Sequence, residues 1–228
     1  MRDKTKKNGK SESNSVKHSN SKFRIEWKNA EQKMAYSTYQ RHDVLFLMGP
    51  AGTGKSYLAT AFAINDILTS SKKKIIITRP IVEAGESIGY LPGTFEEKVD
   101  PYMRPIFDCI DKLCGGDKLQ KEKILQAIEI VPLCYMRGRS FDNAICILDE
   151  AQNASIMQLK LFLTRFGEDS KIVITGDPHQ SDIPSDSVAL SNVVNKLESI
   201  PGIGIVRFSP DSIVRHPLIT KILDKLEQ

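Results

Sequence analysis

The stretch VLFLMGPAGTGKSYLATAF, residues 44–62, decides the fold of this chain. It opens with an apolar run typical of a buried strand and ends in an Ala-rich stretch with helical spacing of its apolar residues. Between them, GPAGTGKS (49–56) fits the pattern G-x-x-x-x-G-K-[ST] at every fixed position. A strand before the loop and a helix after it are the context that this pattern requires. The stretch therefore predicts a strand–loop–helix unit that holds the phosphates of a nucleoside triphosphate.

The chemistry of this loop gives its residues separate roles. Glycines let the backbone curl so that successive N–H groups and the helix N-terminus face the phosphates. Lys55 would reach the β and γ phosphates, and Ser56 would ligate Mg²⁺. A Gly-rich turn without a ligand is the alternative, and the strand and helix flanks argue against it. We therefore expect the nucleotide to be bound by Gly49, Pro50, Ala51, Gly52, Thr53, Gly54, Lys55 and Ser56.

The rest of the chain alternates strand-like and helix-like segments. Short continuous Val, Ile and Leu runs separated by helices are typical of a parallel sheet covered on both faces. We predict an α/β fold, a single RecA-like P-loop NTPase domain with a mostly parallel central sheet and helices on both faces. The expected strands are 43–48, 73–80, 129–138 at an edge, 144–150, 171–177 and 202–208; the expected helices are 28–40, 56–70, 101–113, 117–127, 155–166, 187–198 and 217–226.

Charge is distributed unevenly along the 228 residues. Residues 1–22 hold seven Lys or Arg, two Asp or Glu and no aromatic residue, so we expect a disordered basic tail followed by an ATPase domain over 23–228. The whole chain is +4, which leaves −1 for residues 23–228 and no overall basic footprint. The tail could be a solvated leader or a weak, nonspecific contact to nucleic-acid phosphates.

Several classes of protein are excluded by what the sequence lacks. No apolar run approaches the roughly 20 residues that cross a bilayer, so a membrane protein is not expected. The tail has no apolar core of a signal peptide, and we expect a cytoplasmic location. The four cysteines match no C-x-x-C zinc pattern and are interpreted as reduced residues in or near the core.

Two further motifs end buried strands with polar residues. In ILDEAQ (147–152), Asp149 is placed to hold the magnesium ion, and Glu150 can polarise the attacking water as a general base. In VITGDPHQ (173–180), Gln180 could sense the γ-phosphate, because open parallel sheets gather ligands at the carboxyl ends of their strands. An ordinary polar turn is the alternative at each site, and the phosphate loop upstream favours the catalytic interpretation.

The three motifs, in this order, resemble the core of superfamily 1 helicases. Four longer blocks, 78–108, 135–153, 163–184 and 212–219, look like the signature blocks of the PhoH family of ATPases. The similarity runs from about Asn29 to Ile222, and we expect the stand-alone ATPase form. One departure is SDSVALSN (185–192), where the family would have a Ser-Gly-Leu, so the helix entry after Gln180 could differ.

The resemblance adds roles that spacing alone does not give. It implies that Gln32 contacts adenine and confers a preference for ATP, with an exposed helical glutamine as the alternative. It also makes Arg215 the candidate arginine finger, beside Lys55, Glu150 and Gln180 as catalytic residues. Because one such domain lacks the second core domain of a helicase, Arg215 would act either within its own domain or across a homo-oligomer, which we expect to be a hexameric ring.

The function implied is an ATPase that couples ATP turnover to binding or remodelling of single-stranded nucleic acid, RNA rather than DNA, as expected of an RNA helicase. The alternative is an ATP-dependent switch or assembly factor that acts on a protein partner. A small-molecule kinase fits DEAQ and GDPHQ poorly. Other polar and aromatic residues could contact nucleotide or nucleic acid, or could serve loop ties, core packing or a subunit contact: Arg79, Arg137, Arg139, Tyr90, Phe95 and Tyr102.

Overall fold

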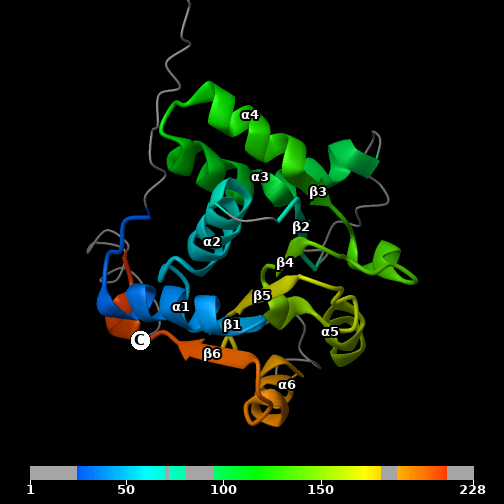
Figure 1. The fold of residues 1–228 in the computed structure, drawn as a ribbon. Coiled ribbons are helices and arrows are strands. Elements are labelled where there is room, and N and C mark those ends of the chain that lie inside the picture. The colour runs from blue at the N-terminus through cyan, green and yellow to red at the C-terminus, as the bar shows by residue number, and fades with distance from the viewer. Residues whose placement is uncertain (1–24, 70–71, 81–94, 181–188, 215–228) are drawn as a thin grey trace, which may run out of the picture.

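Six strands form one sheet in the order β3-β2-β4-β5-β1-β6 (Figure 1), and every pairing in it is parallel. The computed structural model describes residues 25–69, 72–80, 95–180 and 189–214, the side chains of 95–102 excepted. The expected α/β fold with a parallel central sheet is therefore confirmed. The strands are β1 Val44–Met48, β2 Lys74–Thr78, β3 Ile128–Ile130, β4 Ala144–Leu148, β5 Lys171–Gly176 and β6 Ile203–Arg207.

Alternation along the buried strands produces two separate hydrophobic cores. Leu45 and Leu47 of β1 pack into one core, and Phe46 and Met48 pack into the other, because successive strand side chains point to opposite faces. Four helices cover the first face: α1 Ala30–Arg41, α2 Lys55–Thr69, α3 Phe95–Cys114 and α4 Lys118–Ala127. Two helices, α5 Ile156–Leu163 and α6 Ala189–Leu197, cover the second face (Figure 1).

The third expected strand differs most from its prediction. Instead of running over 129–138, β3 spans only Ile128–Ile130, and the chain turns at Pro132 into the 3-10 helix η2, Leu133–Met136. Proline has no backbone N–H to donate to a sheet, so pairing stops there. The structure also begins α3 earlier than expected, at Phe95. The helix expected over 217–226 lies outside the described residues.

Local sequence explains where the helices next to the site begin. Asn29 caps α1 by accepting a hydrogen bond from the Gln32 amide, and Ser155 with Gln158 forms a capping box at the start of α5. Both caps fix segments that flank the carboxyl end of the sheet. None of the helices in the described part of the chain has the length and apolar character that a bilayer span requires.

Candidate nucleotide-binding site

The loop after β1 passes very close to the end of β6. Gly49 has φ +140°, and a Cβ added there would lie 2.6 Å from the Phe208 carbonyl oxygen. The Phe208 amide in turn donates to the Met48 carbonyl over 2.7 Å. The first glycine of the motif is therefore required by the neighbouring strand as well as by its own backbone conformation.

Most carbonyl groups of the loop are held by hydrogen bonds from the protein. The Lys55 ammonium donates to the carbonyls of Gly49 and Pro50 over 2.7 and 2.9 Å. The Val214 amide donates to the Gly52 carbonyl over 2.9 Å. Because the C=O and N–H of one trans peptide point in opposite directions, fixing a carbonyl also fixes the direction of the next amide. The loop is thus held in one conformation by Lys55 at its own end and by Val214 near the carboxyl end of the described chain.

A cluster of three oxygen-bearing side chains lies where the loop meets the sheet. Asp149 directly follows β4 and is 1% exposed. Its Oδ1 accepts hydrogen bonds from Ser56 Oγ over 2.7 Å and from Thr175 Oγ1 over 2.5 Å. Its amide donates to the Thr78 carbonyl over 3.0 Å, which ties it to the end of β2. Carboxylate and hydroxyl oxygens are ligands that Mg²⁺ prefers, so the chemistry of Ser56 and Asp149 fits the expected ion.

Glu150 takes a backbone conformation that is rare outside glycine. Its φ of +54° turns the chain sharply out of β4 into the 3-10 helix η3, Ala151–Asn153. The carboxylate is held from two sides, by Arg79 Nη2 at 3.2 Å and by Gln152 Nε2 at 2.6 Å. Arg79, which follows β2, therefore contacts the candidate general base directly.

Gln152 was not selected from the sequence, although it stands in the DEAQ motif. It is 5% exposed, and its two amide atoms have different partners. Nε2 donates to Glu150, while Oε1 accepts from the Asp177 amide over 3.1 Å. Gln152 therefore joins the polar ends of β4 and β5. Its position two residues after Glu150 was the only available signal.

One cavity of about 330 Å³ gathers these elements. Gln180 is exposed and lines this cavity, and its backbone amide donates to the Asp177 carbonyl over 3.2 Å. The phosphate loop, the motifs ILDEAQ and VITGDPHQ, and the segment after β6 all contribute lining residues to the cavity. The lining residues are Ala51, Gly52, Gly54, Lys55, Ser56, Tyr57, Glu150, Thr175, Asp177, Gln180 and Val214.

Comparison with known proteins identifies the family of this chain. Residues 24–227 match the family model described as PhoH-like protein. The chain belongs to the PhoH family. It is 45% identical over 205 residues to a PhoH-like protein of Bacillus subtilis, covering 90% of this chain and 64% of that protein. It is 37% identical over 199 residues to Protein PhoH of Escherichia coli, covering 86% of this chain and 56% of that protein.

This PhoH-family chain thus spans less than two thirds of the length of these relatives. Among solved structures, it is similar to the large terminase of a thermophilic bacteriophage, with a TM-score of 0.57 and 9% sequence identity. That match covers 86% of this chain and 50% of the terminase. At this identity the likeness shows the fold, which is that of a P-loop NTPase domain.

Gln32 of the PhoH-family chain is not the exposed helical residue considered as the alternative. It is 2% exposed, and its Nε2 donates to the Thr53 carbonyl over 3.0 Å, while its Oε1 accepts from the Lys28 amide over 2.9 Å. Gln32 therefore braces the phosphate loop through a further carbonyl. Its contact with adenine stays a prediction.

The segment after β6 is attached to the start of α1 by Glu31. The Glu31 carboxylate accepts hydrogen bonds from the Ser209 amide over 3.0 Å, from the Ser209 hydroxyl over 2.9 Å, and from the Ser212 hydroxyl. These hydrogen bonds lower the pKa of Glu31, and the one from the Ser212 hydroxyl has the largest effect. Ser212 ends the 3-10 helix η4, Pro210–Ser212, and two residues later Val214 reaches the loop.

Some of the expected contacts fall outside the described residues. Arg215, the candidate finger, follows Val214 directly and lies outside them, as does Tyr90. The side chains of Phe95 and Tyr102 are also not described. Their roles stay predictions.

Proposed function

We propose that this chain hydrolyses ATP in the presence of Mg²⁺ and couples turnover to single-stranded nucleic acid, RNA rather than DNA. The observation that carries the proposal is the cavity of about 330 Å³ shared by the phosphate loop, Glu150 and Gln180. A phosphate cradle, a carboxylate and a polar γ-phosphate sensor are the parts that water-mediated phosphoryl transfer needs. Belonging to the PhoH family supports the ATPase half of the proposal.

Lys55 and the loop amides would bind the phosphates. The Lys55 ammonium now rests on the carbonyls of Gly49 and Pro50, and we propose that it turns to the β and γ phosphates when ATP binds. Ser56 and Asp149 would hold Mg²⁺, which supplies positive charge to the phosphate oxygens when bound. Thr175 keeps Asp149 oriented through its hydrogen bond.

Glu150 would act as the general base toward the attacking water. Arg79 and Gln152 fix its carboxylate, so that one orientation is selected before substrate arrives. Gln180 would contact the γ-phosphate from the loop after β5. Because Gln152 also accepts a hydrogen bond from the Asp177 amide, a shift at the end of β4 would displace the end of β5, and the reverse.

Arg215 would stabilise the charge that develops on the γ-phosphate. The hydrogen bond from Val214 to Gly52 holds the residue directly before Arg215 against the phosphate loop. This contact supports a finger that acts in its own subunit. A hexameric ring with the finger acting across an interface is the other arrangement. Mixed assemblies of Arg215→Ala and Glu150→Gln subunits separate the two, because only a finger acting across the interface restores complete sites.

The test is steady-state ATP hydrolysis with and without single-stranded RNA or DNA, at two salt concentrations. Lys55→Ala should abolish turnover, and Glu150→Gln should bind ATP but hydrolyse it at least ~100-fold more slowly. Salt-sensitive stimulation by RNA is the expected result for the wild type. Near-normal turnover by Lys55→Ala would overturn the mechanism. Turnover that neither polymer changes would instead favour a switch acting on a protein partner.

A further inference from the structure

A groove of about 710 Å³ runs between η2 and α5. η2 follows the end of β3, and α5 follows the end of β4, so both walls stand at the carboxyl edge of the sheet where open α/β folds bind ligands. The groove is lined by Leu133, Cys134, Arg137, Ser155, Met157, Gln158, Lys160, Leu161 and Thr164.

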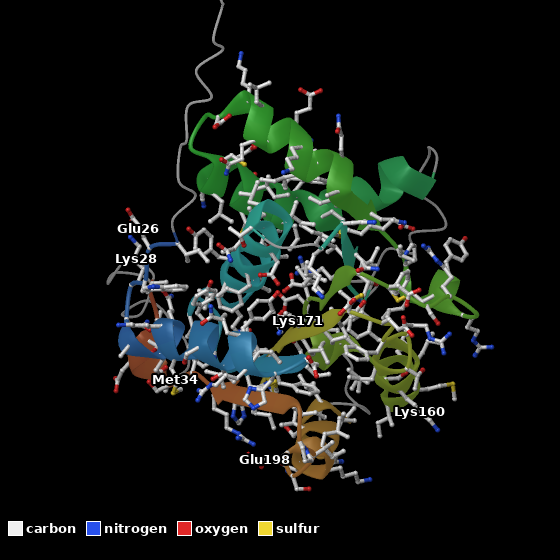
Figure 2. The ribbon with its side chains drawn as sticks, viewed as in Figure 1. Glu26, Lys28, Met34, Lys160, Lys171 and Glu198 are labelled. Atoms are coloured by element: carbon white, nitrogen blue, oxygen red, sulfur yellow. The ribbon has the colours of Figure 1, made fainter. Side chains whose placement is uncertain are left out.

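All the charged residues in this lining are cations. Arg137 and Lys160 contribute two cations, and the lining contains no Asp or Glu. Both side chains are exposed, and within the described residues neither is in an ion pair. Lys160 is labelled on α5 in Figure 2. Residues 23–228 carry −1 overall, so a positive groove is a local feature of this part of the chain, and it complements a polyanion.

The neighbouring arginine of the same MRGR stretch has a different role. Arg139 Nη2 lies 2.6 Å from Glu129, and its guanidinium stacks over the Phe141 ring at 4.8 Å. Arg139 therefore ties the loop to β3, while Arg137 faces the groove. Of the two alternatives that the sequence left open for these arginines, Arg139 takes the loop tie, and contact with phosphate stays a prediction for Arg137.

Exposed apolar groups accompany the two cations. Met157 on α5 lines the groove and is 72% exposed, and Leu133 and Leu161 are further apolar lining residues. Apolar side chains beside cations suit single-stranded nucleic acid, because unpaired bases expose faces that can pack on them while the phosphates contact the charges. We infer that this groove binds single-stranded nucleic acid, with Arg137 and Lys160 on its phosphates and a base packed against Met157. The inference rests on the proposed function and assigns it a binding surface.

The groove is also connected to the catalytic carboxylate. Ser155, which caps α5 and lines the groove, stands five residues after Glu150. The turn between them is closed by a hydrogen bond from the Asn153 amide to the Glu150 carbonyl over 3.0 Å. Nucleic acid bound against α5 would therefore contact a helix whose N-terminal cap is linked by this short turn to Glu150. A shift of α5 on binding could change the position of Glu150, which provides a route for stimulation of ATP turnover.

The test measures binding of fluorescein-labelled oligouridylate and oligothymidylate, about 20 nucleotides long, by fluorescence anisotropy over a range of salt. The probe variant is Arg137→Gln/Lys160→Gln, and the matched control is Lys118→Gln/Lys123→Gln on α4, which covers the opposite face of the sheet. The probe variant should bind at least ~10-fold more weakly, and its slope of log K against log salt should fall by about 1.4, since each lost single-strand phosphate contact removes about 0.7. Basal ATP hydrolysis should not change, because neither residue lines the nucleotide cavity.

A second readout uses Cys134, which is exposed on the groove wall. Bound RNA should slow its alkylation in the wild type and have a weaker effect in the probe variant. Equal affinity and salt slope in wild type and probe variant would overturn the groove while leaving the proposed function standing. Absence of RNA and DNA binding by the wild type would overturn both. Normal RNA affinity with a changed oligomeric state would show that a second copy of the chain docks there, and would also overturn the inference.

Discussion

Val214 donates its amide to the Gly52 carbonyl over 2.9 Å, so the segment after β6 braces the phosphate loop. The same segment is fastened to α1 through Glu31, which accepts hydrogen bonds from Ser209 and Ser212. The start of α1, η4 and the loop therefore form one connected unit. Movement of Val214 would be transmitted directly to the Gly52 peptide of the phosphate loop.

Replacing Glu31 with Gln should loosen this unit. Three hydrogen bonds to a charged acceptor would become bonds to a neutral one, at a cost of about 1 kcal/mol of unfolding free energy for a partly buried carboxylate. We expect a lower melting temperature and weaker ATP binding. Glu26→Gln is the control, because Glu26 is exposed and its ion pair with Lys28 spans 3.8 Å. Equal losses in both variants would contradict the bracing role.

The effect of Glu31 should depend on pH in a defined direction. Its folded-state pKa is lowered from 4.5, so its carboxylate contributes stability above that ordinary value and loses it as pH falls through the folded pKa. The difference in melting temperature between wild type and Glu31→Gln should therefore be constant near neutral pH and shrink below about pH 4.5. A difference that grew on acidification would have the wrong sign and would exclude this cause.

Gln152→Ala should lower kcat more than it changes KM for ATP. Gln152 donates to Glu150 and accepts from the Asp177 amide, and it does not line the nucleotide cavity, so its loss should misorient the proposed general base more than it weakens nucleotide binding. A reduction in kcat of about 10-fold to 100-fold is expected from misplacement of a catalytic group. Asn192→Ala on the exposed surface of α6 serves as the control. Steady-state kinetics with an ATP titration would separate this result from a binding defect, which would appear mainly in KM.

The sequence predicted the parts of this fold that depend on local pattern. The apolar runs of β1, β4 and β5 predicted the buried strands. Because Asp149 and Glu150 directly follow the run of β4, the same pattern predicted that they lie at the carboxyl end of the sheet. Contacts between distant segments were not predictable in the same way. The burial of Gln32 and the hydrogen bond from Val214 to Gly52 depend on how α1 and the segment after β6 pack on the loop. Neither contact has a spacing signature along the chain.

Thiol reactivity should distinguish the four cysteines, none of which is in a disulfide. Burial raises the pKa of Cys146 to about 12 and of Cys109 to about 11, so both thiols should react slowly in the folded protein near pH 8. Cys134 is exposed and should react first with a thiol reagent. Peptide mapping after brief alkylation tests this order, with Cys134→Ser identifying the fast phase. Rapid alkylation of Cys146 without unfolding would contradict its placement in the core.

Gly49→Ala should destabilise the protein more than Gly116→Ala, although both glycines have positive φ. Gly49 has φ +140° and Gly116 has φ +88°, so an L residue is strained at each. A Cβ at Gly116 would meet nothing within 4 Å, whereas one at Gly49 would lie 2.6 Å from the backbone oxygen of Phe208. Backbone atoms of a strand cannot rotate away as a flexible side chain can, so β1, β6 or the loop must shift.

This shift should add about 1–3 kcal/mol to the loss of unfolding free energy in Gly49→Ala, as overpacking does elsewhere. It should also weaken ATP binding, because the displaced peptide begins the phosphate loop. Urea denaturation of both variants beside wild type gives the free energies, and a fluorescent ATP analogue gives the affinities. Equal denaturation midpoints for the two variants would mean that backbone conformation alone sets the requirement for glycine, and that β6 does not restrict the loop.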